Sequence, residues 1–125
     1  MGDLFNSISA SVSGMSAQST RLRLSAENIA NADTPGYRRK LVPFEQVLDG
    51  TVRPGNVQLD RSERERIYDP AHPMAGGDGY YEGSNVNLMI EIADAREAQR
   101  SYEANLRMFD QARQMTSSIL DLLRR

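Results

Sequence analysis

Apolar residues recur at alternating steps of three and four along both ends of this 125-residue chain, but not along its middle. The two periodic segments span residues 4–31 and 87–125, and this spacing places apolar side chains along one side of an α-helix. At 1.5 Å per residue, the two helices would be about 40 and about 55 Å long. The pattern predicts a mainly α fold, in which long N- and C-terminal helices pack as a coiled-coil-like pair.

The periodic apolar positions form two stripes, which we call the seam. We expect the two stripes to face each other across the helix pair, with both chain ends together, and to form the surface for assembly with neighbouring chains. Two consecutive steps of three around Phe109 shift the second stripe slightly around its helix. The seam comprises Phe5, Ile8, Val12, Met15, Leu22, Ile29, Ile92, Tyr102, Leu106, Phe109, Met115, Ile119 and Leu122.

The middle of the chain is rich in turn-forming residues. Residues 32–86 contain all five prolines and most of the glycines. Proline lacks a backbone N–H group, so Pro43 limits any strand around it to a sheet edge. We therefore expect a small, irregular, β-containing outer domain over residues 32–85, and a helical core domain formed by residues 1–31 and 86–125. Short strands are expected within residues 37–47, 52–59 and 64–68.

Composition excludes several classes of function. The formal charge is −2, from 15 basic and 17 acidic residues, whereas proteins that bind nucleic acid usually carry a basic surplus. The chain has no cysteine and one histidine, so it offers no thiolate nucleophile, no Cys-based zinc site and no multi-histidine metal site within one chain. We expect no cofactor, no metal and no nucleic-acid partner.

The first helical segment carries little charge, although a solvated helix face usually carries more. Two explanations remain open: other protein covers much of its circumference, or the segment is a disordered arm that orders on assembly. Serines interrupt its apolar residues, and the chain begins with an acidic Met1-Gly2-Asp3. No run approaches the roughly 20 apolar residues of a membrane span, so we expect neither a span nor a standard cleaved signal.

The residues that could take part in catalysis or ligand binding do not show the spacing of a catalytic or binding site. His72 is a candidate base or metal ligand, but it lies between prolines in an expected loop. The glycine-rich stretch 76–79 lacks the Lys-Ser/Thr pair of a phosphate-binding loop. We interpret the basic run 38–40 as a solvated or interface strand, and the acidic residues between 91 and 97 as ordinary helix charges. The sequence therefore does not indicate an enzyme.

The stretch from Asn28 to Arg38 resembles the signature that ends the N-terminal helix in the flagellar rod, hook and axial protein family. Residues 100–105 resemble a second motif of that family, and residues 68–73 with 85–87 are similar to its proximal-rod members. Asparagines near a helix end can bond free carbonyls, and a Pro-Gly pair turns the chain away. The matching turn-motif residues are Asn28, Asn31, Thr34, Pro35, Gly36 and Tyr37.

The resemblance implies a structural subunit of the bacterial flagellar proximal rod, which polymerises into a helical tubular drive shaft and transmits torque. It also implies a basal-body rod that crosses the periplasm, with export that needs no cleaved signal peptide. The implied partners are further copies of this chain, neighbouring proximal and distal rod proteins, the flagellar type III export apparatus, the base-adaptor protein and the rod cap.

Two other functions are weighed against this one. A soluble enzyme would need convergent polar residues in the 68–80 loop, which the sequence does not display. A two-helix adaptor or coiled-coil chaperone would carry more charge on its first helix and would lack an elaborate middle segment.

Overall fold

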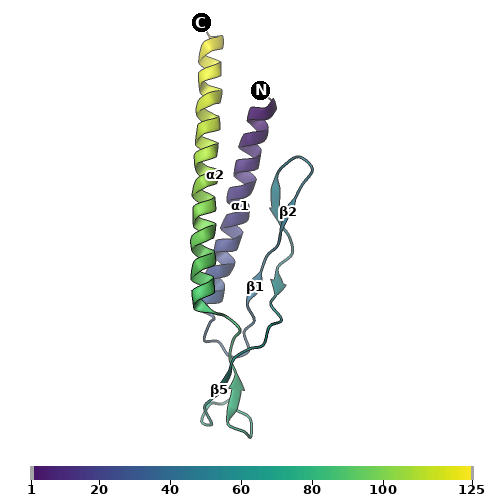
Figure 1. The fold of residues 1–125 in the computed structure, drawn as a ribbon, viewed down its shortest axis with the longest axis vertical. Helices are drawn as coiled ribbons and strands as arrows, with labels where there is room; N and C mark the ends of the chain where they lie inside the picture. The colour runs from purple at the N-terminus through teal and green to yellow at the C-terminus, as the bar shows by residue number, and fades with distance from the viewer. Residues whose placement is uncertain (1, 125) are drawn as a thin grey trace.

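The computed structural model describes residues 2–124 and shows an elongated molecule built on two long antiparallel helices (Figure 1). Helix α1 spans Gly2–Ala30 and helix α2 spans Leu88–Leu123. Both ends of the chain lie at the same end of the helix pair, and both connections to the middle segment lie at the other (Figure 1). The predicted pairing of a long N-terminal with a long C-terminal helix is therefore confirmed.

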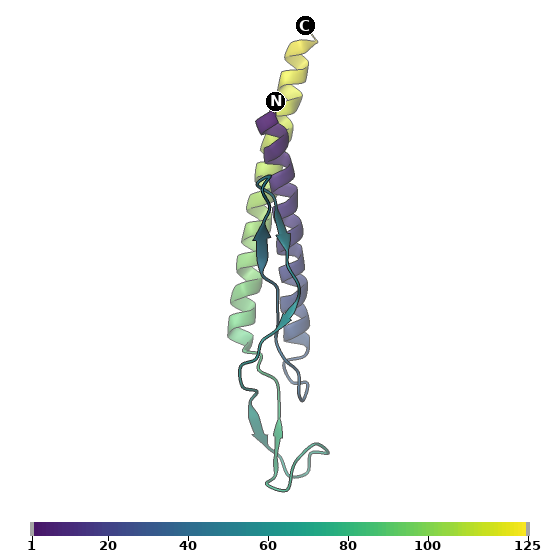
Figure 2. The same ribbon diagram turned by 90° about the vertical axis from the view of Figure 1, so that its right-hand side faces the viewer.

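The two helices differ in length, and this leaves one end of the longer helix unaccompanied. Helix α1 has 29 residues and α2 has 36, so α2 runs past the start of α1 (Figure 2). Asn87 caps the start of α2, where its side-chain oxygen accepts a hydrogen bond from the backbone N–H of Met89 at 3.0 Å. No helix within residues 2–124 is long and apolar enough to cross a membrane.

The helices meet through small side chains. A Cβ atom at Gly14 would lie 2.7 Å from Oδ1 of Asn105, so the backbone of α1 and this side chain approach closely. Ser11 on α1 is buried, as are Ala98 and Ala112 on α2. Small residues allow two helix axes to approach, and van der Waals contact between backbones then replaces the interlocking of large side chains.

The prediction that the two apolar stripes face each other is wrong for most of their length. The positions in the helix contact lie one residue earlier: the buried Ser11 and the closely approached Gly14 precede Val12 and Met15, and the buried Glu91 precedes Ile92. One residue is about 100° around a helix, so most of the seam points sideways from the contact. The helices carry two stripes of identical spacing, and the one with small side chains is used between them.

The C-terminal half of the seam does take part in the helix contact. Phe109 and Ile119 are half-buried, and Ala112 between them is buried. The two steps of three around Phe109 rotate the stripe towards α1, in the direction that the shift in spacing indicates. Met115 and Leu122 remain exposed.

The middle segment forms three two-stranded antiparallel pairs. The first two lie in one long hairpin, the ribbon (residues 40–59), which folds back along α1, and the third hairpin points away beyond the helices (Figure 1). Pro43 lies between two strands, so its missing N–H interrupts the ribbon without loss of a ladder bond. The strands are β1 (Lys40–Leu41) with β4 (Gln58–Leu59), β2 (Phe44–Gln46) with β3 (Val52–Pro54), and β5 (Arg66–Tyr68) with β6 (Tyr80–Glu82).

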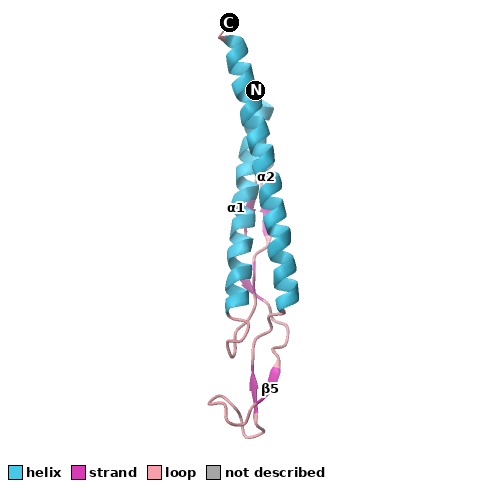
Figure 3. Cartoon of the chain, turned by 90° about the vertical axis from the view of Figure 1, so that its left-hand side faces the viewer, coloured by secondary structure: helices cyan, strands magenta, loops and turns pink. Residues whose placement is uncertain are grey.

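The ribbon packs along α1, which it contacts through β1 and β3. The backbone N–H of Val52 donates to Oγ of Ser13 at 3.1 Å, and Ala17 and Leu24 are buried on the same side of α1. These positions are rotated from the helix contact in the direction opposite to the seam. Figure 2 shows the ribbon in front of both helices, and Figure 3 shows the helices from the side that the ribbon leaves uncovered.

The uncovered side presents apolar residues from both helices. Because the helices are antiparallel, a step of one residue forward from the contact turns α1 and α2 towards the same side of the pair. Phe5 is 53% exposed and Val12 46%, while Tyr102 and Leu106 on α2 are also exposed. We call this surface the open face. It comprises the exposed Phe5, Val12, Ile92, Tyr102 and Leu106, and the half-buried Ile8, Met15 and Leu22.

Candidate functional site

Asn28 joins the end of α1 to the start of the ribbon. Its side chain is buried, with 1% of its surface exposed. Nδ2 donates to the carbonyl of Lys40 at 3.0 Å, and Oδ1 accepts from the backbone N–H of Lys40 at 2.9 Å. The hydroxyl of Tyr37 also donates to Oδ1, at 2.7 Å. The amide therefore acts as a strand partner for Lys40 and fixes where β1 begins relative to α1.

Tyr37 and Lys40 are held in defined protonation states by their surroundings. Burial, and next the charge of Glu27, raise the pKa of the Tyr37 phenol, which keeps it protonated as a donor to Asn28. The ammonium group of Lys40 pairs with the Glu27 carboxylate, and this hydrogen bond raises the pKa of Lys40.

The next turn takes the chain away from the helix axis. Nδ2 of Asn31 donates to the carbonyl of Glu27 at 2.9 Å, and the hydroxyl of Thr34 donates to Oδ1 of Asn31 at 3.1 Å. Pro35 precedes Gly36, whose φ of 76° lies in the left-handed region that glycine adopts without strain. The motif thus satisfies a helix-end carbonyl and reverses the chain within six residues, from Asn31 to Gly36.

The same turn is tied to the segment that returns to α2. The backbone N–H of Gly36 donates to the carbonyls of Glu82 and Gly83, both at 3.1 Å. The Arg64 guanidinium donates to the carbonyl of Gly36 at 3.0 Å and pairs with the Glu82 carboxylate at 2.6 Å. The Ser84 hydroxyl donates to the carbonyl of Ala32. The exit from α1 and the return to α2 therefore form one hydrogen-bonded junction.

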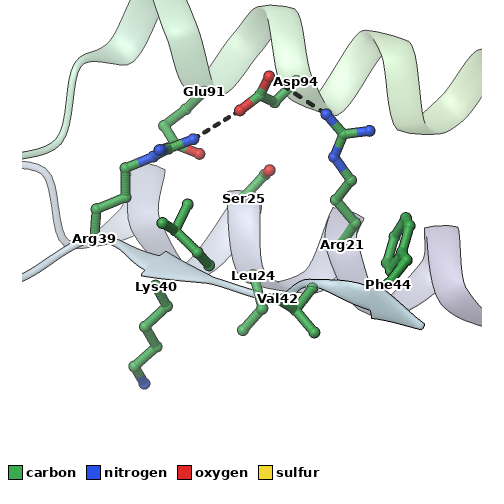
Figure 4. A pocket seen from close by; sticks show the side chains of 10 residues that line it. Arg21, Leu24, Ser25, Arg39, Lys40, Val42, Phe44, Glu91 and Asp94 are labelled. Carbon is green, nitrogen blue, oxygen red and sulfur yellow. Dashed lines mark hydrogen bonds and ion pairs between the residues drawn. The ribbon is translucent and has the colours of Figure 1, made fainter. Parts of the chain in front are cut away.

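An ion-pair network beside this junction joins Arg39, the residue before the ribbon, to both helices (Figure 4). The Glu91 carboxylate, 1% exposed, pairs with the guanidinium of Arg39, which also reaches Asp94 at 2.7 Å. Arg21 on α1 lies 3.5 Å from Asp94 and 3.4 Å from Glu97. A buried carboxylate is costly without a cation, so this network fixes the ribbon base against α2.

The interpretation of Glu91 as an ordinary helix charge is wrong, because this carboxylate is buried; of the two alternatives for the basic run, solvated or interface strand, Arg39 fits a contact with α2 and not a solvated position. The sequence shows only a basic run and an acidic helix start 52 positions apart, and neither pattern reveals that folding brings them together. Asn85 reinforces the link, because its Oδ1 accepts from the backbone N–H of Arg39 at 2.6 Å. Nδ2 of Asn85 donates to the carbonyl of Asp60 at 2.9 Å. The side chain of Asp60 accepts a hydrogen bond from the backbone N–H of Ser62, and this bond holds the pKa of the Asp60 carboxyl below its usual range.

The third hairpin contains the remaining candidates. The imidazole of His72 stacks on the ring of Tyr81 at a centroid distance of 3.9 Å, and its Nδ1 accepts from the backbone N–H of Met74 at 3.1 Å. Gly76 donates to the carbonyl of Tyr80 at 2.9 Å, and Gly79 donates to that of Gly76 at 3.0 Å. These N–H groups serve the loop itself. No group of three metal-ligating side chains occurs within residues 2–124.

The seam residues outside the open face lie in three places. Ile29 is at the end of α1, Phe109 and Ile119 line the helix contact, and Leu122 is exposed near the end of α2. A groove of about 540 Å³ runs beside the start of α1 and opens to solvent. Its apolar lining is formed by Leu4, Met108, Ala112, Met115 and Ile119.

Comparison with known proteins identifies relatives over nearly the whole chain. Residues 8–38 match the model of the Flagella basal body rod protein family, and residues 78–122 match that of the Flagellar basal body rod FlgEFG protein C-terminal region. The chain is 46% identical to the flagellar basal-body rod protein FlgC of Agrobacterium fabrum, over 90% of this chain and 89% of the relative. It is 32% identical to FlgC of Borreliella burgdorferi (96% and 97%) and 31% identical to FlgC of Salmonella typhimurium (95% and 97%).

Proposed function

The chain belongs to the FlgC family of flagellar basal-body rod proteins, and from this premise we propose that it polymerises into the helical, tubular proximal rod and transmits torque. The family role is that of a structural subunit of the flagellar rod. In our proposal the terminal helices, residues 1–31 and 86–125, form the core of the tube, and residues 32–85 lie outside it. The seam residues that lie outside the contact between the two helices form the assembly surface.

The open face is the single observation that carries this proposal. Large apolar side chains follow both helices at regular spacing, yet the subunit leaves Phe5, Val12 and Leu106 exposed. Contiguous exposed apolar surface of this kind marks a protein–protein contact, and its burial stabilises by about 25 cal/mol per Å². Neighbouring rod subunits would cover it, which also accounts for the low charge of α1.

The internal packing of the subunit suits torque transmission. A shaft must resist twisting, so its subunits need connections that do not slide. The close approach of Gly14 to Asn105 and the pairing of Arg39 with Glu91 both fix one element against another. The junction around Gly36 fixes the middle segment to both helices at once.

The small core suits export in an unfolded state. The buried apolar residues described in the structure are Ala17, Leu24, Ala98 and Ala112, and the chain has no cysteine to form a disulfide. Little burial opposes unfolding of such a subunit before assembly. We infer passage through the flagellar type III apparatus without a cleaved signal, and a rod position that crosses the periplasm.

The proposed partners are further copies of this chain, the neighbouring proximal and distal rod proteins, the base-adaptor protein and the rod cap.

Complementation of a strain that lacks this chain tests the proposal. Val12→Asp and Leu106→Asp place a carboxylate in the assembly contact, where its desolvation opposes binding. Both variants are expected to abolish motility and intact rods while the purified chains keep their helical circular dichroism. Leu48→Asp is the matched control, since Leu48 is fully exposed on the ribbon turn. Motility equal to that of the control in both open-face variants would refute the proposal.

A further inference from the structure

A cleft lies between α1, the base of the ribbon and α2, beside the ion-pair network (Figure 4). We call it the ribbon cleft. Its volume is about 270 Å³, below the range of drug-sized pockets, so it has room for one side chain or a molecule of similar size. Polar groups from both helices lie between apolar walls. The walls are formed by Leu24, Leu41, Val42 and Phe44.

Ser25 brings a buried hydroxyl to the ribbon cleft. The residue is 4% exposed, and its hydroxyl has no hydrogen-bond partner within residues 2–124. Figure 4 shows the hydroxyl pointing from α1 into the space between Arg39 and Arg21. By contrast, the hydroxyl of Ser11 on the same helix donates to a carbonyl one turn back, at 2.8 Å. A buried polar group without a partner is costly, so this position favours a ligand that forms a hydrogen bond.

Arg21 and Asp94 offer further hydrogen-bonding capacity at the cleft. Both ion pairs of Arg21 use Nη2 and are long, at 3.5 Å to Asp94 and 3.4 Å to Glu97. Its Nε–H and Nη1–H groups therefore have no acceptor within the described residues. Each oxygen of Asp94 accepts one bond, from Arg39 at 2.7 Å or from Arg21 at 3.5 Å, and a carboxylate oxygen can accept two. The cleft thus presents N–H donors, carboxylate acceptors and a hydroxyl that can act as either.

The charges that line the cleft are balanced. The guanidinium groups of Arg21 and Arg39 accompany the carboxylates of Glu91 and Asp94, while Lys40 pairs with a carboxylate of α1. An added carboxylate or ammonium group would carry a charge without a counterion into this partly buried network, which opposes binding. A neutral group that both donates and accepts avoids this cost. A carboxamide has these properties, because its oxygen accepts and its NH₂ group donates.

We propose that the ribbon cleft binds a carboxamide group between Ser25, Arg21 and Asp94. The amide oxygen accepts from Arg21, the amide NH₂ donates to Asp94, and the Ser25 hydroxyl bonds to either end. Aliphatic carbons attached to the amide lie against Leu24 and Phe44. The amide comes from an asparagine or glutamine side chain of a neighbouring rod subunit or from a free small molecule, and only the first source rests on the proposed polymerisation.

Three molecules of nearly equal shape test the proposal on the dilute full chain. Propionamide is neutral, propionate is an anion and propionamidinium is a cation. Each is titrated at constant ionic strength, while NMR follows the side-chain Nε–H of Arg21 and the backbone N–H groups of Ser25 and Val42. Propionamide is expected to bind at least about tenfold more tightly than either charged analogue. Equal affinities, tighter binding of a charged analogue, or no saturable shift with propionamide overturns the proposal.

A serine substitution identifies the hydroxyl that the ligand meets. Ser25→Ala removes this hydroxyl and should weaken propionamide binding about fivefold, the effect of one lost hydrogen bond. Ser16→Ala is the matched control, because Ser16 is exposed on the same helix and does not line the cleft. It should leave the affinity unchanged. Equal affinities of the two variants would overturn the assignment of the site to this cleft.

Thiol labelling separates the two sources of the amide. Phe44 is 37% exposed at the cleft, so the thiol of Phe44→Cys should react with a maleimide in dilute chains. If a neighbouring subunit supplies the amide, labelling in isolated rods should be about tenfold slower. An unchanged rate in rods, together with propionamide binding, identifies a free small amide as the ligand. Because the titrations require no rod, failure of polymerisation and failure of the cleft to bind an amide are distinguishable.

Discussion

The side-chain amide of Asn28 pairs with the backbone of Lys40 in both directions, at 3.0 and 2.9 Å. One buried side chain on the last turn of α1 thereby takes the place of a neighbouring strand. The ribbon begins at this residue pair, so the orientation of everything from β1 to β4 depends on it.

Asn28→Ala should destabilise the subunit by about 2–3 kcal/mol, because it leaves buried partners at Lys40 and Tyr37 without hydrogen bonds. Asn28→Asp buries a carboxylate and sets one of its oxygens against the carbonyl of Lys40, so it should be at least as destabilising as the alanine variant. Urea unfolding monitored by circular dichroism measures both. Asn56→Ala, in an exposed ribbon loop, is the control and should be close to neutral.

The contact between the helices makes a second prediction at Gly14. Gly14→Leu inserts atoms where even a Cβ would be 2.7 Å from Asn105, so the helices must separate. We expect a loss of about 1–3 kcal/mol. In Gly14→Ala, the better helix propensity of alanine is stabilising, whereas its Cβ clashes with Asn105. A second substitution, Asn105→Ala, should relieve that clash. Thermal unfolding of the single and double variants measures the coupling, and strict additivity would contradict the close contact.

The burial of Glu91 makes a third prediction. Arg39→Ala removes the cation beside a carboxylate that is 1% exposed, and should cost about 3–5 kcal/mol. The double variant Arg39→Met, Glu91→Leu removes both charges and should be more stable than the single variant. Denaturant unfolding of the unmodified chain, Arg39→Ala and the double variant measures this. A double variant no more stable than Arg39→Ala would show that the pair itself, rather than the unpaired charge, determines stability.

The periodicity of the sequence predicted both helices and their pairing, because a three–four pattern over 28 or more residues has no other compact solution. It did not predict which stripe the helices share. Val12 and Ser11 belong to stripes of equal spacing, and hydrophobicity favours the Val12 stripe, although the helices meet at the Ser11 stripe. The strands at 40–46, 52–59 and 66–68 fall within the predicted ranges. Strand β6 was missed, because the surrounding glycines mark a loop.

The junction between the exit from α1 and the return to α2 was only partly predictable from the sequence. The motif around Asn31 and Gly36 marks a helix end and a turn on local grounds. The roles of Arg39, Glu91 and Asn85 depend on contacts across 46 to 55 positions, and no local pattern carries that information. Charged residues are solvated by default, so only the fold identifies the few that are buried.

A fourth prediction concerns the stability of the subunit at alkaline pH, which depends on the protonation of Tyr37. Its folded pKa lies above the ordinary 10.0, chiefly because of burial, so the neutral phenol contributes its full stability below pH 10.0. That contribution is lost as the pH rises through the raised pKa. Tyr37→Phe should lower stability at pH 8 and show a shallower further loss above pH 10. The difference between the two proteins reports the titration of Tyr37 together with its charge coupling to Lys40. Parallel pH profiles would contradict the assignment.

Thiol labelling on the open face tests the central claim most directly. Val12→Cys and Leu48→Cys chains are labelled with a maleimide, first as dilute chains and then within isolated rods. In dilute chains both thiols should react rapidly, since both positions are exposed. In rods we predict that Val12→Cys reacts at least about tenfold more slowly, because a thiol under a packed contact reacts only when the contact opens, while Leu48→Cys keeps its rate. Equal labelling of the two positions in rods would contradict the open face as the assembly surface.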